Sequence, residues 1–160
     1  MTLSDAVFTR SSCRDFSPAP LSPIQRRQLE KAAEICSQRS GLRLQLVCDE
    51  PEPFSSLLKG WGRIKGARNY FLLTGPAGDG DLEEKCGFYG EELVLTAQTM
   101  GLATCWVGGT YDKKRCAARL APGEELVCVI AVGSPAHPES PAASRPLKPL
   151  EELAPGSENA

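Results

Sequence analysis

Two arginines and two serines stand close together near the start of the chain, within the sequence RSSCRDF. They follow a short amphipathic segment, so their side chains and the free backbone groups at its end can converge on one anion. A guanidinium group pairs with phosphate oxygens two at a time, and each charge-assisted hydrogen bond contributes about 1.5–3 kcal/mol. The pattern indicates a phosphate site, with solvated arginines and a turn serine as the alternative. The residues concerned are Arg10, Ser11, Ser12 and Arg14.

A second segment, GLATCWVGGTY, places Gly108 and Gly109 directly after a predicted strand. Two backbone N–H groups there are not shielded by side chains, so a flat ring system can lie against the end of the strand. Trp106 could be a wall of that pocket or a residue of the core. Cys105 has no histidine near it in sequence to activate its thiol, so we interpret it as a small buried apolar residue.

The remaining charged groups do not form an acid–base apparatus. Arg145 and Lys148 place positive charge near the C-terminus, where plain solvation is the alternative to anion binding. His137 lies between prolines and is interpreted as non-catalytic, and no clustered carboxylates have metal-ligand spacing. An enzyme without such side chains can still work if a cofactor carries the reaction. We therefore infer that the protein binds a phosphorylated, planar, redox-active cofactor.

Composition excludes several other classes of protein. The 160 residues suit one domain. With 18 Lys and Arg against 20 Asp and Glu, the formal charge of −2 gives no overall field to attract nucleic acid or an anionic membrane. No apolar run approaches the length of a membrane span. The seven cysteines are odd in number and lack a CxxC pair, so we expect reduced thiols in a soluble, cytoplasmic protein.

Apolar periodicity and capping residues predict the elements that position these segments. Thr2 can cap the first helix, Ser22 with Gln25 forms a capping box for the second, and Asp81 can cap the third. Two glycines inside the third helix, Gly87 and Gly90, indicate close approach by another backbone or a ligand. The order of elements fits an α+β or an α/β layered domain. We expect helices over 3–8, 23–40, 82–100 and 113–120, and strands over 42–48, 69–75, 104–107 and 126–133.

The composition changes after Gly133, where proline, serine, alanine and glutamate dominate. Such a sequence has few apolar side chains to bury, which favours an extended segment. We therefore expect a domain over 1–133 and an extended C-terminal arm over 134–160.

Four segments together resemble the FMN-dependent nitroreductase family, and most closely its short subgroup. They are RSSCRDF with the capped helix after it, GFYGEELVLTAQTMGLATCWVGGTYDK, LVCVIAVGSP and RPLKPLEEL. The resemblance spans almost the whole chain. Its most specific part is the run from Gly87 through Lys113, which contains the pattern GxxGExLxLxAxxxGLxTCW.

This resemblance implies an α+β fold, with a central, mainly antiparallel sheet flanked by helices. It also implies an intertwined homodimer with FMN in the subunit interface. By the same analogy, positions at the FMN phosphate and ribityl chain match Arg10, Ser11 and Ser12. Arg14 matches a position at the N1 and O2 edge of the flavin ring. The segment beside the ring matches Trp106, Val107, Gly108 and Gly109, and a basic pair returning to the phosphate matches Arg145 and Lys148.

The implied activity is hydride transfer from NADH or NADPH to flavin N5, and then reduction of a nitro compound, a quinone or a similar small electrophile. N5 and solvent can supply the proton, so no side chain is assigned as a catalytic acid or base. The chain departs from the family where SGLRLQLVCDE replaces a common Asn-x-Gln-Pro-Trp segment, and the stretch between Leu46 and Tyr70 is short. A non-catalytic flavin carrier or sensor, and a thiol protein that uses some cysteines for metal or redox exchange, remain as alternatives.

Overall fold

Four antiparallel strands form one sheet in the order β1-β2-β4-β3. The strands are β1 (Arg43–Val47), β2 (Tyr70–Pro76), β3 (Ala103–Val107) and β4 (Glu124–Gly133). The structure is a computed structural model that describes residues 1–55 and 64–138. Because the strands pair in antiparallel fashion, the sheet confirms the α+β fold rather than the α/β alternative.

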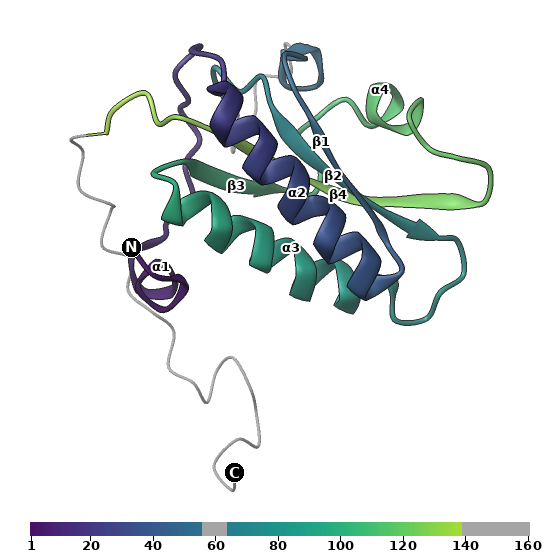
Figure 1. Ribbon diagram of the computed structural model, residues 1–160. Coiled ribbons are helices and arrows are strands. Elements are labelled where there is room, and N and C mark those ends of the chain that lie inside the picture. Colours follow the sequence, from purple (N-terminus) through teal and green to yellow (C-terminus); the bar gives the residue numbers. More distant parts are fainter. Residues whose placement is uncertain (56–63, 139–160) are drawn as a thin grey trace, which may run out of the picture.

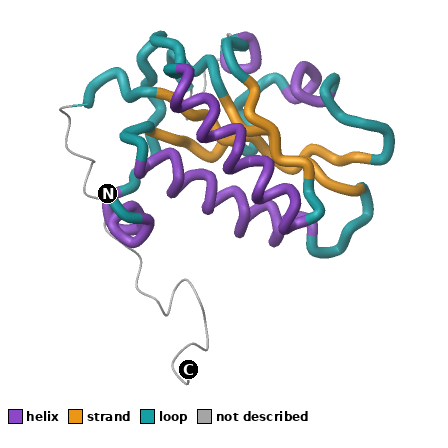
Figure 2. Tube along the Cα trace, viewed as in Figure 1, coloured by secondary structure: helices purple, strands orange, loops and turns teal. Residues whose placement is uncertain are grey.

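Two long helices, α2 (Pro23–Ser40) and α3 (Leu82–Thr99), lie side by side over one face of the sheet (Figure 1). Figure 2 shows the same two layers by secondary structure. The helix α2 begins as predicted, with a capping box between Ser22 and Gln25, and it ends at Gly41 in the left-handed conformation. No helix among the described residues is both long and apolar enough to cross a membrane.

The predicted N-cap position of α3 is confirmed, but the predicted capping hydrogen bond is not formed. Asp81 is the N-cap residue, but its side chain accepts no capping hydrogen bond, and its backbone is not extended, as a capping residue requires. Asp79 instead stabilises the turn that leads into the helix. Its carboxylate accepts a hydrogen bond from the Asp81 backbone N–H at 3.0 Å and pairs with Lys85 at 2.8 Å.

Three short helices complete the described chain: α1 (Leu3–Thr9), the 3-10 helix η1 (Glu52–Phe54) and α4 (Lys113–Ala117). Thr2 caps α1, and the side chain of Asp112 caps α4, both as predicted. The helix α4 ends three residues before the expected boundary, and no sequence pattern predicted η1.

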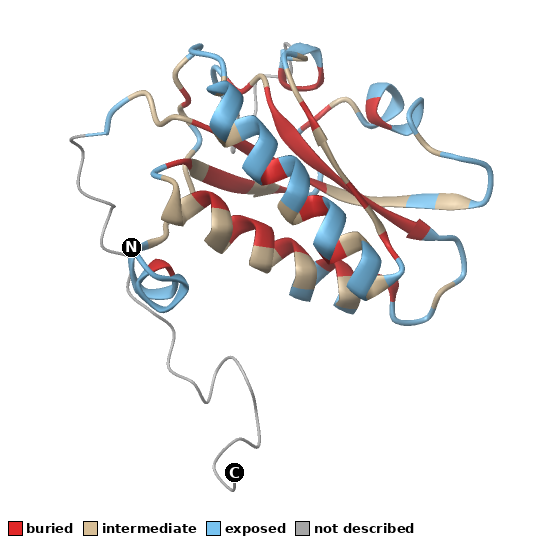
Figure 3. Cartoon of the chain, viewed as in Figure 1, coloured by how far each residue is buried: buried red, intermediate tan, exposed pale blue. Residues whose placement is uncertain are grey.

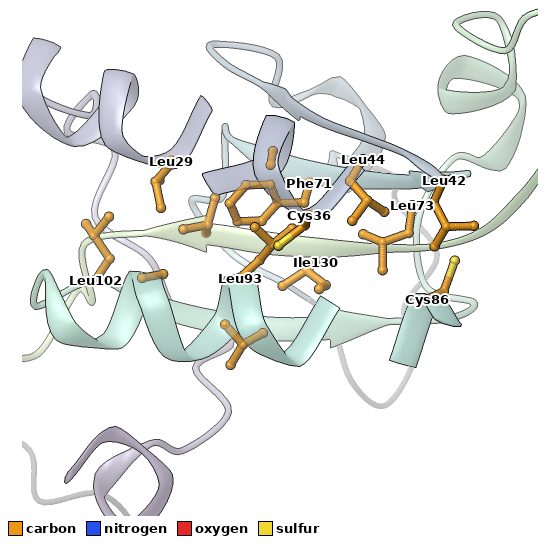
Figure 4. Close-up of a cluster of buried hydrophobic side chains, with 14 of the residues drawn as sticks. Leu29, Cys36, Leu42, Leu44, Phe71, Leu73, Cys86, Leu93, Leu102 and Ile130 are labelled. Atoms are coloured by element: carbon orange, nitrogen blue, oxygen red, sulfur yellow. The ribbon is translucent and has the colours of Figure 1, made fainter. Parts of the chain in front are cut away.

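The main core lies between the two long helices and the sheet, where leucines and small side chains interlock (Figure 4). The outward face of α2 is exposed (Figure 3). Gly90 belongs to this packing, because a Cβ atom there would overlap the indole ring of Trp106 and come within 2.8 Å of Leu73. Gly90 is closely approached, but by two side chains rather than by the backbone or the ligand that the sequence predicted. At Gly87 no described residue comes within 4 Å of an added Cβ.

A second apolar cluster covers the opposite face of the sheet. The connecting segments supply Phe16, Phe54 and Tyr111, which pack with Tyr70 and Leu72 of β2. The two long helices cover one face of the sheet, so loop segments must cover the other. The N-terminal segment does this in part, because it places Phe16 in the second cluster.

Gly66 permits this placement of Phe16. Its φ of +69° lies in the left-handed region, and a Cβ atom there would overlap the carbonyl oxygen of Phe16. We predict that Gly66→Ala lowers the unfolding free energy by about 3–4 kcal/mol, from backbone strain plus the clash. The control is Gly78→Ala, at φ +85° with no described neighbour within 4 Å, which should cost only about 1–2 kcal/mol. Equal urea midpoints for the two variants would contradict this explanation.

All seven cysteine side chains are free thiols, and two of them lie within the main core. Burial raises the pKa of Cys36 and of Cys86 to about 11, from 9.0 for an unperturbed thiol. Unfolded thiols therefore release protons before folded ones. We predict that the unfolding free energy falls as pH rises from about 9 to 11, by on the order of 1 kcal/mol per pH unit for each thiol. Urea melts across this range are the measurement, and the double variant Cys36→Ala with Cys86→Ala should show a shallower decline.

Candidate functional site

Backbone hydrogen bonds hold the N-terminal segment, residues 10–17, against one end of the sheet. Cys13 donates its N–H to the Thr104 carbonyl of β3 at 2.9 Å. Arg14 and Phe16 are bonded to Lys65, at 2.8 and 2.9 Å. Ser17 donates to the Ser134 carbonyl after β4, and Ala136 donates to the Asp15 carbonyl, both at 2.9 Å. The segment that carries the arginine-serine motif is therefore fixed by its main chain.

A cavity of about 400 Å³ opens beside this segment. Ser11, Ser12 and Arg14 line it, as does Gln98 of α3. The turn 101–103 into β3 forms another wall, and the chain after β4 borders it as far as Pro138. The structure thus brings three of the predicted site residues to one cavity.

Charged groups of both signs surround the cavity. Arg14 is exposed and has no ion-pair partner within the described part of the chain. The carboxylate of Asp15 lies 3.9 Å from Nε2 of His137, and both residues line the cavity. Sequence reasoning set His137 aside and did not single out Asp15, because nothing local links positions so far apart. His137 is 71% exposed, so the structure gives it no enclosed catalytic environment.

Arg10 and Trp106 meet at a residue that sequence reasoning missed, Glu91 of α3. The indole Nε1–H donates to Glu91 Oε2 at 3.0 Å, and Nη1 of Arg10 lies 3.7 Å from Glu91 Oε1. The Nε of Arg10 is buried with no hydrogen-bond partner among the described residues. Two sequence-predicted site residues are therefore joined through one carboxylate.

The side chains of the TCWV segment are mostly committed to packing. The Trp106 ring lies against Gly90 on the helix side of the sheet, and Val107 is buried in the cluster on the opposite side. This favours the core interpretation for the indole ring. The segment offers a ligand mainly its backbone.

Gly108 and Gly109 follow the end of β3, are exposed, and have open space where a Cβ would stand, as judged within the described chain. Neither has a left-handed φ. Ala103, which borders the cavity, lies four residues before Val107, a separation of about 13 Å along an extended strand. A single ligand that reaches both the cavity and the glycines must therefore be elongated.

A separate polar cluster has a structural role. Tyr70 donates to Glu50 Oε1 at 2.8 Å, and Arg119 pairs with the other carboxylate oxygen. Burial raises the pKa of the Glu50 carboxyl, but the hydrogen bonds from Arg119 and Tyr70, together with the positive charges of Arg119 and Arg115, lower the net pKa. Burial, and then the bond to Glu50, raises the pKa of Tyr70. The groups satisfy one another and tie the chain before β4 to the end of β1.

The cysteines do not gather into a reactive site in the described chain. Burial raises the pKa of Cys13, and Cys105 is 3% exposed. Within residues 1–55 and 64–138, no three His, Cys, Asp or Glu side chains are grouped so as to hold a metal ion. The geometry therefore offers no support for the thiol-protein alternative. The predicted residues Arg145 and Lys148 lie outside the described residues.

Solved structures share this fold at low sequence identity. A nitroreductase family protein from Clostridium difficile 630 is 21% identical, with a TM-score of 0.71 over 98% of this chain and 99% of that one. A nitroreductase with bound FMN from Bacteroides fragilis is 14% identical, with a TM-score of 0.71 over 92% and 95% of the two chains. A protein from Desulfovibrio desulfuricans in complex with FMN is 18% identical, with a TM-score of 0.70 over 96% and 95%. No curated protein matches the chain.

The family comparison covers nearly the full length of the sequence. The model of the family described as "Putative TM nitroreductase" matches residues 2–159. That match includes the N-terminal segment, both long helices and all four strands. The chain therefore belongs to this nitroreductase family.

Proposed function

We propose that the protein is an FMN-dependent oxidoreductase of the nitroreductase type. The observation that carries the proposal is a set of unused hydrogen-bond donors at one cavity. The hydroxyls of Ser11 and Ser12 and the guanidinium group of Arg14 line it, and none has a side-chain partner among the described residues. Family membership and the FMN held by two structural neighbours support the same choice of ligand.

The residues present fit the phosphate of FMN. The buried Arg10 Nε lacks a partner among the described residues, so the guanidinium has donor capacity to spare. A phosphate monoester accepts several charge-assisted hydrogen bonds, each shorter and stronger than a neutral one. Arg10, Ser11 and Ser12 would hold the phosphate and ribityl chain, with Arg14 at the N1 and O2 edge of the ring.

The ring end also fits. FMN is elongated, with its phosphate and its ring system at opposite ends, which suits a site that extends from the cavity to the two glycines. Gly108 and Gly109 leave their backbone N–H groups open to a flat ring, and Trp106 and Val107 hold that backbone in place from the two sides of the sheet. In the resemblance these N–H groups face N5 and O4.

When bound, FMN supplies the redox chemistry, accepting a hydride from NADH or NADPH and passing electrons to a nitro compound, a quinone or a similar small electrophile. The chain's own part is to bind and orient. The positive charge of Arg14 would stabilise negative charge that develops at the adjacent ring edge. No side chain is assigned to proton transfer.

The C-terminal arm can take part in the same site. Pro138 borders the cavity, and Arg145 follows seven residues later. Seven extended residues span up to about 23 Å, which is enough for the chain to return to the cavity. We therefore include Arg145 and Lys148 as phosphate ligands of the arm 134–160, beside the FMN-binding domain 1–133.

An exposed apolar surface on α1 and α3 supports a homodimer. Leu3, Val7 and Phe8 are 52%, 56% and 88% exposed, and Phe88 of α3 is 66% exposed. Ala6 is the buried residue of α1, so most of this helix projects into solvent (Figure 3). Exposed apolar patches of this kind mark interfaces. We propose that a second copy covers them, in a cytoplasmic protein whose free thiols suit a reducing compartment.

The first prediction from this proposal concerns colour and reduction. Purified protein should bind free FMN and become yellow, and NADH or NADPH under nitrogen should bleach the flavin absorbance until a nitro compound or quinone restores it. A yellow protein whose spectrum does not respond to either nucleotide would instead identify a flavin carrier or sensor. Protein that remains colourless in excess FMN would contradict the proposal.

The phosphate assignment is tested on the same preparation. Arg10→Ala should lose about 1.5–3 kcal/mol of FMN affinity, one to two decades in Kd, because it removes a charged donor to the phosphate. Arg39→Ala is the matched control, since Arg39 pairs with Glu92 at 2.6 Å and is remote from the cavity. Equal losses in the two variants would remove Arg10 from the site.

The dimer prediction uses exposed apolar residues on two different helices. Phe8→Asp should shift the protein from dimer to monomer in light scattering, because a carboxylate would be buried in the interface. Ile24→Asp, at a 71% exposed position of α2, should leave the dimer intact. A wild-type protein that is monomeric while holding FMN tightly would overturn the proposed interface.

A further inference from the structure

We propose that Glu91 is a positioning residue that sets the affinity of the site for a phosphate monoester. The inference rests on the proposed function, because it assumes that Arg10 binds the phosphate of FMN. The Glu91 carboxylate balances the charge of Arg10 when no phosphate is bound, and it repels a phosphate that binds Arg10.

The two carboxylate oxygens of Glu91 face different partners. Oε2 accepts a hydrogen bond from Trp106 at 3.0 Å, which is an ordinary length. Oε1 lies 3.7 Å from Nη1 of Arg10, too far for a hydrogen bond but close enough for an ion pair. Glu91 is therefore held in place by the indole, while Arg10 keeps its N–H groups for another acceptor.

The partial exposure of Arg10 and Glu91 limits the strength of their ion pair. The side chains of Arg10 and Glu91 are 22% and 39% exposed, so solvent screens their attraction. A phosphate that binds Arg10 through paired oxygens makes shorter, stronger contacts and displaces the carboxylate as its principal partner. The hydrogen bond to Trp106 nevertheless keeps Glu91 nearby, so its charge repels the bound phosphate.

The Glu91 carboxylate lowers the affinity of the site for every phosphate that contacts Arg10. A phosphate carried on FMN gains contacts with the ring and ribityl chain that offset the repulsion, whereas a small free anion does not. Glu91 would therefore weaken FMN binding somewhat and weaken the binding of inorganic phosphate in the same way. Riboflavin, which lacks the phosphate, should not be affected.

The experiment compares Glu91→Gln with wild type in titrations of FMN and of riboflavin at low salt. The glutamine oxygen can still accept the hydrogen bond from Trp106, so only the charge is removed. We expect FMN to bind about two- to fivefold more tightly to the variant, with no change for riboflavin. The gain should shrink as salt is added, because the interaction is electrostatic.

Glu92→Gln is the matched control. It makes the same chemical change one residue along the same helix, where the carboxylate pairs with Arg39 instead. Its FMN affinity should equal that of wild type. Glu91→Met, neutral and of similar length, carries the same expectation for FMN and replaces Glu91→Gln if that variant does not fold; it should also shift the fluorescence of Trp106.

The outcomes separate this inference from the proposed function. If wild type binds FMN but the neutral variants bind it equally or more weakly, the role of Glu91 is overturned and the proposed function stands. If both FMN and riboflavin bind more tightly, the effect is structural and the inference also fails. If wild type does not bind FMN, both proposals fail together.

Discussion

The candidate site depends on the backbone hydrogen bonds of residues 10–17. These bonds tie the N-terminal segment to β3, to Lys65 and to the chain after β4. Since they use main-chain atoms, they leave the side chains of Ser11, Ser12 and Arg14 free to line the cavity. Phe16, near the end of the segment, is buried in the second apolar cluster, so it also fixes the segment to the sheet face opposite the two long helices. The position of the proposed anion site is thus a property of the sheet.

Charge balance around the site follows from this placement. The site holds two arginines and two carboxylates: Glu91 lies near Arg10 and Asp15 lies near His137, while Arg14 has no ion-pair partner among the described residues. A site with little net charge does not attract anions by long-range field, and the whole chain, at −2, does not either. Recognition of the proposed phosphate must then come from geometry, because several directed hydrogen bonds are needed to displace water and the Glu91 carboxylate. A phosphate monoester with a ring to anchor meets that requirement.

Local sequence patterns predicted the elements where the stabilising contacts are themselves local. The capping box at Ser22 and the glycine at 41 sit within four residues of the helix ends they define, so α2 could be predicted closely. The missing capping hydrogen bond of α3 could not be predicted, because it depends on the backbone conformation of the turn at Asp81 rather than on the residue type. The carboxylate of Glu91 was missed for a related reason. Its partners come from α1 and β3, and no spacing in the sequence indicates that they meet.

Some glycines of the family motif are explained by packing within the fold, and others are not. Gly90 is required by this chain alone, because Trp106 and Leu73 occupy the space of its Cβ. The second glycine of the GxxGE pattern is therefore explained by the packing of α3 against the sheet. Gly87, Gly108 and Gly109 have no such neighbour among the described residues, and all three are exposed. A glycine inside a helix costs about 1 kcal/mol relative to alanine. Gly87 lies next to the exposed Phe88, so the second copy that we propose would give this glycine a close neighbour.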